Sequence, residues 1–155
     1  MDIRHITPVY AVSPQIDVAD IAAIAAAGFT TIICNRPDAE VPPSHQADTI
    51  RAAAEAAGIT FAVNPVTHQG LNMGMVDSQM AAADASSGPV LAYCASGTRS
   101  SIVWSLGQAG KMPTHAILQA TAQAGHHLGG MRGHLGMLAK GSGPSLPMCK
   151  IRRAR

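Results

Sequence analysis

The sequence predicts an α/β fold with a parallel-rich central sheet flanked by helices. Short apolar, β-prone runs alternate three times with Ala-rich segments of helical length, and Gly or Pro residues separate these segments. Such alternation is typical of parallel strands joined by helical crossovers. Apolar residues make up 47% of the 155-residue chain and charged residues 13%, a balance that excludes disorder of the whole chain.

The first half of the chain begins with two strand-like pieces. Residues 3–6 and 9–12 flank Thr7-Pro8 and predict a hairpin or a pair of strands. Two helix–strand units follow. The expected helices are residues 18–27 and 47–57, and the expected strands are residues 29–34 and 59–63. Gly28 and Gly58 each follow a helical segment, where Gly supplies a left-handed stop.

The second half continues the pattern and then changes character. The expected elements are a helix over 75–85, a strand over 90–93, and helices over 100–109 and 114–124. We therefore expect one domain over residues 1–125. Residues 126–155 carry six basic residues and no acidic one, are rich in Gly, and show little helical periodicity. We expect them to form a basic, weakly ordered extension, of which residues 130–155 contribute little to the fold.

Several classes of protein are excluded by composition. The longest uncharged, apolar-leaning stretch, residues 21–35, is shorter than the ~18–20 apolar residues that a membrane span needs. Residues 1–5 lack the apolar region of a secretory signal. We expect a soluble, cytoplasmic protein without a membrane partner. Aromatic residues make up only 3%, so no stacking platform is available and nucleic acid is not expected as a partner.

The three cysteines are Cys34, Cys94 and Cys149, and no two lie close in sequence. This spacing indicates neither a disulfide framework nor a zinc knuckle, and the histidines at 126, 127 and 134 fit no standard zinc pattern, so we expect no metal. Cys34 ends a predicted buried strand and is expected to be a core residue rather than a resolving thiol.

One segment combines the residues that anion chemistry needs. Residues 94–100 read Cys-Ala-Ser-Gly-Thr-Arg-Ser and lie between a predicted buried strand and a predicted helix. A loop in this place directs backbone N–H groups and the positive end of the helix dipole at one spot. The same field stabilises a Cys94 thiolate as a nucleophile, Gly97 permits a tight turn, and Arg99 offers a planar fork for an oxyanion. The alternative is that Cys94 is a small buried residue.

The expected anion site extends to a second loop. Its members are Ala95, Ser96, Gly97, Thr98, Arg99 and Arg36. Arg36 either adds charge to this site or pairs with Asp38 and Glu40 on the surface.

These residues resemble a known family. The carriers are Cys94-x-x-Gly-x-Arg-Ser after Gly88-Pro89-Val90-Leu91-x-Tyr93, Asn35-Arg36-Pro37-Asp38, and Pro65-Val66. Over residues 1–125 the chain resembles the phosphatase-like domain family of the bacterial β-lactamase-hydrolase-like proteins. The resemblance implies a dual-specificity-phosphatase-like fold, Cys94 as nucleophile and residues 96–99 as anion loop. It also implies a persulfide-dioxygenase-like hydrolase as a partner. Ala95 replaces an Arg that many relatives carry.

Members of that family are described both as phosphatase-like hydrolases and as rhodanese-type sulfurtransferases. Phosphatases of the Cys-Arg class place five residues between the nucleophile and the arginine, whereas only Ala95 to Thr98 intervene here. The shorter loop resembles rhodanese and favours a terminal persulfide sulfur over a phosphoryl group. A phosphatase also needs a general acid. Residues 67–74 contain His68 but no Asp, so Asp38 is the substitute, unless it only caps a loop.

Three functions follow, and none needs a cofactor. The first is a sulfurtransferase that carries sulfane sulfur as a Cys94 persulfide between small-molecule or protein donors and acceptors. The second is a phosphatase that acts on aryl phosphates or phosphotyrosine through a Cys94 phosphothioester, with Ser100 assisting departure of the cysteine and Asp38 or His68 as acid. The third is a non-catalytic module that binds an anion or a protein partner. We expect the first.

Overall fold

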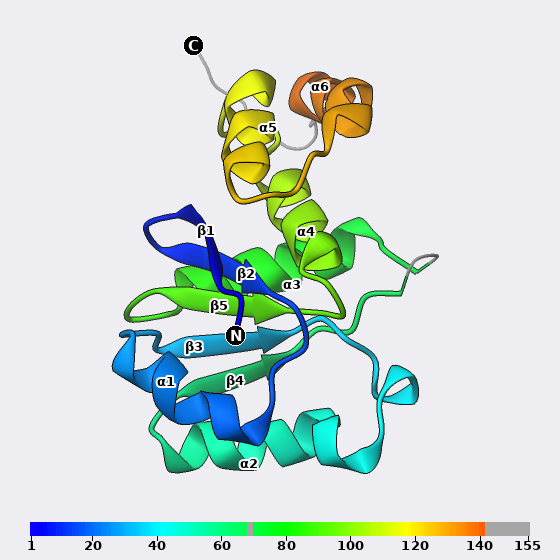
Figure 1. Cartoon of the computed structure of the whole chain (residues 1–155). Coiled ribbons are helices and arrows are strands. Elements are labelled where there is room, and N and C mark those ends of the chain that lie inside the picture. Colours follow the sequence, from blue (N-terminus) through cyan, green and yellow to red (C-terminus); the bar gives the residue numbers. More distant parts are fainter. Residues whose placement is uncertain (68–69, 142–155) are drawn as a thin grey trace.

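The computed structural model describes residues 1–67 and 70–141. A five-stranded sheet in the order β1-β2-β5-β3-β4 forms its centre (Figure 1). The strands are β1 (Arg4–Thr7), β2 (Tyr10–Ser13), β3 (Thr31–Cys34), β4 (Thr60–Val63) and β5 (Val90–Tyr93). β1 and β2 are antiparallel, and the other three pairs are parallel. The predicted fold class, a parallel-rich sheet flanked by helices, is therefore confirmed.

The strand register brings four chain segments to one edge of the sheet. Tyr93 of β5 is paired with Ser13 of β2 and with Cys34 of β3, and Cys34 is paired with Val63 of β4. All four strands thus end at the same level. Because the carboxyl ends of parallel strands meet at this edge, the residues that follow each strand converge there.

Helices cover both faces of the sheet (Figure 1). On one face lie α1 (Ile21–Ala26) and α2 (Ala47–Ala56), and on the other lie α3 (Met73–Asp84) and α4 (Thr98–Gln108). Two hydrophobic clusters result. Ile24, Ile50 and Phe61 belong to one, and Ile33, Val103 and Trp104 belong to the other. The alternation of buried residues along β3 explains why Ile32 and Ile33 serve opposite faces.

The loops contain more short helices than the sequence suggested. The predicted helix over 18–27 is a 3₁₀ turn, η1 (Val18–Asp20), followed by α1. A capping box begins it, because the Asp17 carboxylate accepts the N–H of Ala19 and the Asp20 carboxylate accepts the N–H of Asp17. Two further 3₁₀ turns, η2 (Asp38–Glu40) and η3 (Pro43–His45), lie between β3 and α2, where no regular element was predicted. Glu40, the last residue of η2, contacts the guanidinium of Arg99.

Most of the described part of the predicted extension is helical, so the expectation of weak order is wrong for residues 129–141. After α5 (Thr114–Gln123), the chain forms η4 (Gly129–Met131) and α6 (Arg132–Gly141). The side chain of Leu135 has no exposed area and belongs to the same cluster as Val103 of α4 and Ile117 of α5. The rest of the extension, with Cys149, lies outside the described residues. Within the described ranges, no helix has the length and apolar character that a bilayer crossing requires.

Candidate active site

The cysteine loop lies where the sequence predicted it, between β5 and α4. Gly97 has a φ of 94°, and the Gly97 N–H donates to Cys94 Sγ at 3.1 Å. A Cβ atom at position 97 would come within 3.2 Å of the His126 ring and would also take up a strained backbone conformation. Glycine here lets the loop fold back over Cys94, whose side chain is fully buried.

Backbone donors remain available around this loop. Among the described residues, no protein acceptor binds the N–H groups of Ala95, Ser96, Arg99 or Ser100. Arg99 and Ser100 lie in the first turn of α4, whose N–H groups have no intrahelical partner. The hydroxyls of Ser96 and Thr98 bond to each other at 3.1 Å. Such a set of free amides at a helix N-terminus is suited to an anion.

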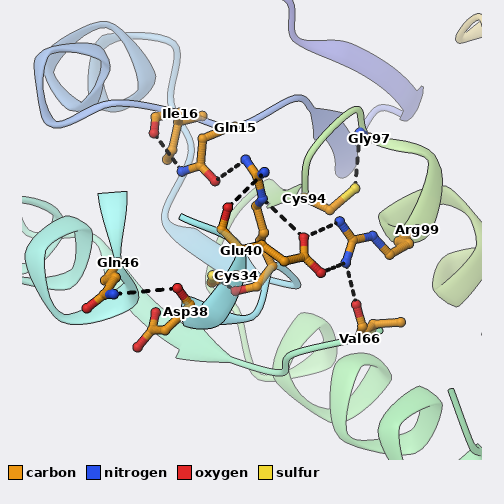
Figure 2. A network of polar contacts seen from close by, with 11 residues as sticks. Gln15, Ile16, Cys34, Asp38, Glu40, Gln46, Val66, Cys94, Gly97 and Arg99 are labelled. Carbon is orange, nitrogen blue, oxygen red and sulfur yellow. Dashed lines mark hydrogen bonds and ion pairs between the residues drawn. The ribbon is translucent and has the colours of Figure 1, made fainter. Parts of the chain in front are cut away.

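Arg99 is held by a partner that the sequence analysis did not assign to it. Its Nη1 donates to Glu40 Oε2 at 2.9 Å and to the Val66 carbonyl at 2.7 Å, and its Nη2 donates to Glu40 Oε1 at 2.8 Å (Figure 2). Arg99 is only 6% exposed. These hydrogen bonds between Arg99 and Glu40 lower the pKa of Glu40 below its ordinary value and raise the pKa of Arg99.

The contact of Glu40 with Nη1 and Nη2 of Arg99, called the Glu40 clamp, leaves one edge of the guanidinium without a partner among the described residues. Of the five N–H groups of Arg99, two on Nη1 and one on Nη2 are bonded, and no described residue accepts from Nε. The free Nε and Nη2 donors form the side-on fork, which matches two oxygens of a carboxylate or phosphate. The clamp therefore orients Arg99 without exhausting it.

Arg36 takes the surface-pairing alternative. Its Nε donates to Glu40 Oε1 at 3.2 Å, and its Nη1 donates to Gln15 Oε1 at 3.2 Å. The pairing is with Glu40 alone and does not include Asp38. Arg36 and Arg99 thus share Glu40 as an acceptor, and direct anion binding by Arg36 stays a prediction.

Asp38 has a structural partner away from the nucleophile. Its Oδ1 accepts the N–H of Ala47, the first residue of α2, at 2.8 Å. Figure 2 shows Asp38 well away from Cys94, on the side of Gln46. The structure thus gives the carboxylate the capping position that the sequence analysis named as its alternative, and a role as general acid stays a prediction.

Ser100 also has a partner other than the nucleophile. Its hydroxyl donates to Asn35 Oδ1 at 2.8 Å, and both side chains are fully buried. The predicted assistance to a departing Cys94 would need this hydrogen bond to be exchanged. The sequence analysis did not assign a role to Asn35. Its position directly after the buried strand β3 is the one feature of the sequence that could have indicated a residue of the site.

His126 lies behind the loop, although the sequence analysis considered it only as a metal ligand. Its Nδ1 is 3.4 Å from Thr98 Oγ1, and burial lowers the pKa of His126. Across residues 1–67 and 70–141, no group of His, Cys, Asp and Glu is arranged to hold a metal ion. His68 lies outside the described residues.

Cys34 is a core residue, as predicted. It belongs to the cluster that contains Tyr93, its thiol donates to the Arg36 carbonyl at 3.3 Å, and burial raises the pKa of Cys34. A thiol of this kind is poorly suited to act as a second nucleophile.

Residues 2–111 match the family model described as "Beta-lactamase hydrolase-like protein, phosphatase-like domain". The chain belongs to this family. A Beta-lactamase hydrolase-like protein of Agrobacterium fabrum is 33% identical over 92 residues, which cover 59% of this chain and 21% of that protein. The chain thus matches about a fifth of the length of this curated relative.

Solved structures agree with the assignment. A candidate phosphatase of Neisseria meningitidis z2491 is 36% identical, with a TM-score of 0.78, over 88% of this chain and 97% of that chain. The catalytic core of the PP-IP phosphatase Siw14 of S. cerevisiae has a TM-score of 0.61 at 12% identity, over 80% of this chain and 76% of that one. The second likeness shows the fold alone. The phosphatase-like family and fold are therefore established, whereas no comparison supports the predicted rhodanese-type activity.

Proposed function

We propose that this chain is a cysteine-dependent phosphoester hydrolase that acts on aryl phosphates, phosphotyrosine among them. The observation that carries the proposal is the state of Arg99. Glu40 and the Val66 carbonyl occupy three of its donors and leave the Nε–Nη2 fork free. A fork held in this way is suited to two oxygens of a transferring phosphoryl group, and Arg99 is five residues from the Cys94 nucleophile in the same loop.

The first half of the reaction is transfer to sulfur. The Cys94 thiolate attacks phosphorus, an S–P bond forms, and the P–O bond to the aryl group breaks. The non-bridging oxygens of the phosphoryl group accept hydrogen bonds from the free N–H groups of Ala95, Ser96 and Ser100 and from the Nε–Nη2 fork of Arg99. These donors are fixed before the reaction, so they stabilise the charge of the transition state at little reorganisation cost.

The nature of the leaving group follows from Asp38. Its carboxylate caps α2, so the aryl oxygen takes its proton from water unless another acid reaches it. An aryl oxide is a better leaving group than an alkoxide and needs less protonation, which is why we propose aryl phosphates as the substrate class.

The second half of the reaction restores the enzyme. A water molecule attacks the phosphorus of the phosphocysteine, the S–P bond breaks, inorganic phosphate leaves, and Cys94 returns as a thiolate. The Gly97 N–H donates to Cys94 Sγ at 3.1 Å and stabilises the sulfur as it regains its negative charge.

A sulfurtransferase is the second candidate, and it is favoured by the loop length, since only four residues lie between Cys94 and Arg99. In that reaction the thiolate attacks the sulfane sulfur of thiosulfate and expels sulfite. Cyanide or an acceptor thiolate then attacks the terminal sulfur of the persulfide and releases Cys94. A persulfide is a monoanion with one terminal atom, so it makes less use of a bidentate arginine.

The test compares both activities in one preparation. Phosphate release from p-nitrophenyl phosphate and thiosulfate:cyanide transfer are measured for the wild type, Cys94→Ser and Arg99→Ala, with Arg51→Ala as the control arginine. Arg51 pairs with exposed Asp48 and lies over the ring of Phe61, and it has no part in the Arg99–Glu40 contact. We expect phosphate release that Cys94→Ser abolishes and that Arg51→Ala leaves unchanged. Robust sulfur transfer without phosphate release would overturn the proposal in favour of the second candidate.

A further inference from the structure

A network of buried polar side chains lies directly beneath the cysteine loop. It consists of Tyr10 on β2, Asn35 after β3, Asn64 after β4, Gln79 on α3 and Ser100 on α4. Asn35, Gln79 and Ser100 have no exposed area, and Tyr10 is 3% exposed. Burying so many amide and hydroxyl groups is costly unless each is hydrogen-bonded.

The hydrogen bonds of this network centre on two amides. Asn35 Nδ2 donates to Gln79 Oε1 at 2.7 Å, and Gln79 Nε2 donates back to Asn35 Oδ1 at 3.0 Å. The second N–H of Gln79 goes to Tyr10 Oη at 2.8 Å, and Asn64 Nδ2 donates to Gln79 Oε1 at 2.9 Å. The second N–H of Asn35 goes to the Asn64 carbonyl at 2.9 Å. Both amides are fully bonded, so each has a fixed orientation.

Asn35 touches the cysteine loop at both of its ends. Ser100, which follows Arg99, donates its hydroxyl to Asn35 Oδ1 at 2.8 Å. The Asn35 N–H donates to the carbonyl of Tyr93, which precedes Cys94, at 2.8 Å. One residue thereby joins the start of the loop to the first turn of α4.

Asn35 also reaches Arg99 by a second route. Its carbonyl accepts the N–H of Val66 at 2.8 Å, and the Val66 carbonyl in turn accepts Arg99 Nη1 at 2.7 Å. The side chain of Asn35 therefore holds the hydroxyl of Ser100, the residue next to Arg99, while the main-chain carbonyl of Asn35 holds Val66, the acceptor of the Arg99 guanidinium.

We propose that Asn35, oriented by Gln79, is a positioning residue that sets the separation of Cys94 and Arg99. This inference deepens the proposed function and rests on it for its catalytic meaning. Phosphoryl transfer depends on the placement of nucleophile and clamp, and a shift of about 1 Å can cost roughly a hundredfold in rate. A purely apolar contact in this place would resist sliding of α4 less than a directional hydrogen bond does.

The experiment pairs two hydroxyl deletions on the same helix. Ser100→Ala removes the bond to Asn35, and Ser105→Ala removes a bond to the Ser101 carbonyl at 2.9 Å within α4. Both serines are fully buried, so the two changes are matched in chemistry and burial. Asn35→Ala and the double variant with Ser100→Ala complete the set, and Gln79→Met replaces Asn35→Ala where that variant does not fold.

Three measurements are made on each variant. They are kcat and KM with p-nitrophenyl phosphate, the rate of Cys94 alkylation by iodoacetamide with its protection by inorganic tungstate, and the melting temperature. The alkylation and tungstate measurements report the geometry of the loop without requiring turnover, so they remain informative where the wild type hydrolyses no phosphate ester.

We expect Asn35→Ala to lower kcat about tenfold or more with little change in KM and to weaken tungstate protection. Ser100→Ala acts in the same direction, and the double variant is no worse than Asn35→Ala alone, because the two residues act as one unit. Ser105→Ala stays near the wild type. The proposal would be overturned by either of two results. One is an equal fall in kcat and in tungstate protection for Asn35→Ala and Ser105→Ala at matched stability. The other is a double variant in which the effects of Asn35→Ala and Ser100→Ala on kcat simply add.

Failure of the proposed function gives a different pattern. If the wild type shows no phosphate release but tungstate protection falls in Asn35→Ala and not in Ser105→Ala, the positioning role stands and the phosphatase falls. If tungstate protection is the same in every variant, the positioning role falls whatever the turnover.

Discussion

The two ends of the parallel strands each carry a hollow, and the two hollows differ in volume and in the charge of their lining. At the amino ends, a pocket of about 510 Å³ is lined by residues of the β1–β2 turn, α3, the turn before β5, α4 and the turn after α4, including Val9, Met80, Trp104 and Met112. Asp84 is the only acid or base in its lining. At the carboxyl ends, the hollow behind the cysteine loop measures only about 150 Å³, and its lining includes Arg4, Ser96 and His126.

The donors that suit an anion lie at the carboxyl ends of the strands and not around the larger pocket. Free N–H groups, the Arg99–Glu40 clamp and the buried amides of Asn35 and Gln79 all gather at the carboxyl edge. A helix that follows a parallel strand presents its N-terminus at this edge, which makes it the favoured place for an anion. The lining of the larger pocket contains no arginine, lysine or histidine.

The largest expected effect comes from Arg99. Arg99→Ala removes the bidentate donor and leaves Glu40 without its buried partner, so we expect kcat/KM for an aryl phosphate to fall about a hundredfold or more. Steady-state kinetics measure the loss. A fall of less than threefold in a folded variant would show that the carboxyl edge does not depend on the clamp.

The next effect concerns the loss of folding stability at acidic pH. Because the pKa of Glu40 is held below its ordinary value of 4.5, the ionised clamp stabilises the fold above that value and is lost as the pH falls through the lowered pKa. Glu40→Gln should therefore lose less stability than the wild type on acidification below about pH 4.5 and should lower kcat/KM about tenfold at neutral pH.

Denaturant titration at several pH values measures this difference. Glu55→Gln is the control, because Glu55 is exposed on α2. Identical acid limbs for the wild type and Glu40→Gln would contradict the clamp.

The parts of the site that were predictable are those that are local in sequence. Cys94, Gly97 and Arg99 lie within one loop, and the strand before it and the helix after it can be recognised from composition. The partners are not local. Glu40 is 59 residues from Arg99, Asn35 is 65 residues from Ser100, and Gln79 is 44 residues from Asn35. Only the folded sheet edge brings these residues together, so spacing could not reveal them.

The same contrast explains the errors in the fold. The four-residue strands were visible as apolar runs between Gly and Pro residues. In contrast, α6 was missed because Gly133 and Gly136 have a low helix propensity, which the tertiary burial of Leu135 outweighs. Asp38 illustrates the limit for sites, because a carboxylate that caps α2 and one that serves as an acid look alike in sequence.

A smaller effect is expected at His126, at the back of the loop. Burial lowers its pKa, so the unfolded chain binds more protons and stability falls as the pH drops below 6.5, the ordinary value. His126→Gln should remove this part of the acid loss and should change kcat/KM less than about threefold. Thermal melts between pH 5 and 7 measure it, with exposed His127→Gln as the control. Equal pH dependence in His126→Gln and the wild type would refute the assignment.

The smallest effect on turnover is expected at the amino ends. Met80→Ala enlarges the larger pocket and should lower stability by about 1–2 kcal/mol, because Met80 is partly buried against the core. We expect kcat/KM to stay within about twofold of the wild type. A loss of turnover comparable to that of Arg99→Ala would break the contrast between the two edges.

The central claim is that Cys94 carries a phosphoryl group. Intact mass measurement after rapid acid quench of the wild type with p-nitrophenyl phosphate tests it most directly, with Cys94→Ser treated alike and a parallel sample exposed to thiosulfate. We predict a wild-type species heavier by one phosphoryl group, located on Cys94 by peptide mapping and absent from Cys94→Ser. A species heavier by one sulfur atom after thiosulfate, with no phosphoryl adduct and no phosphate release, would contradict the claim.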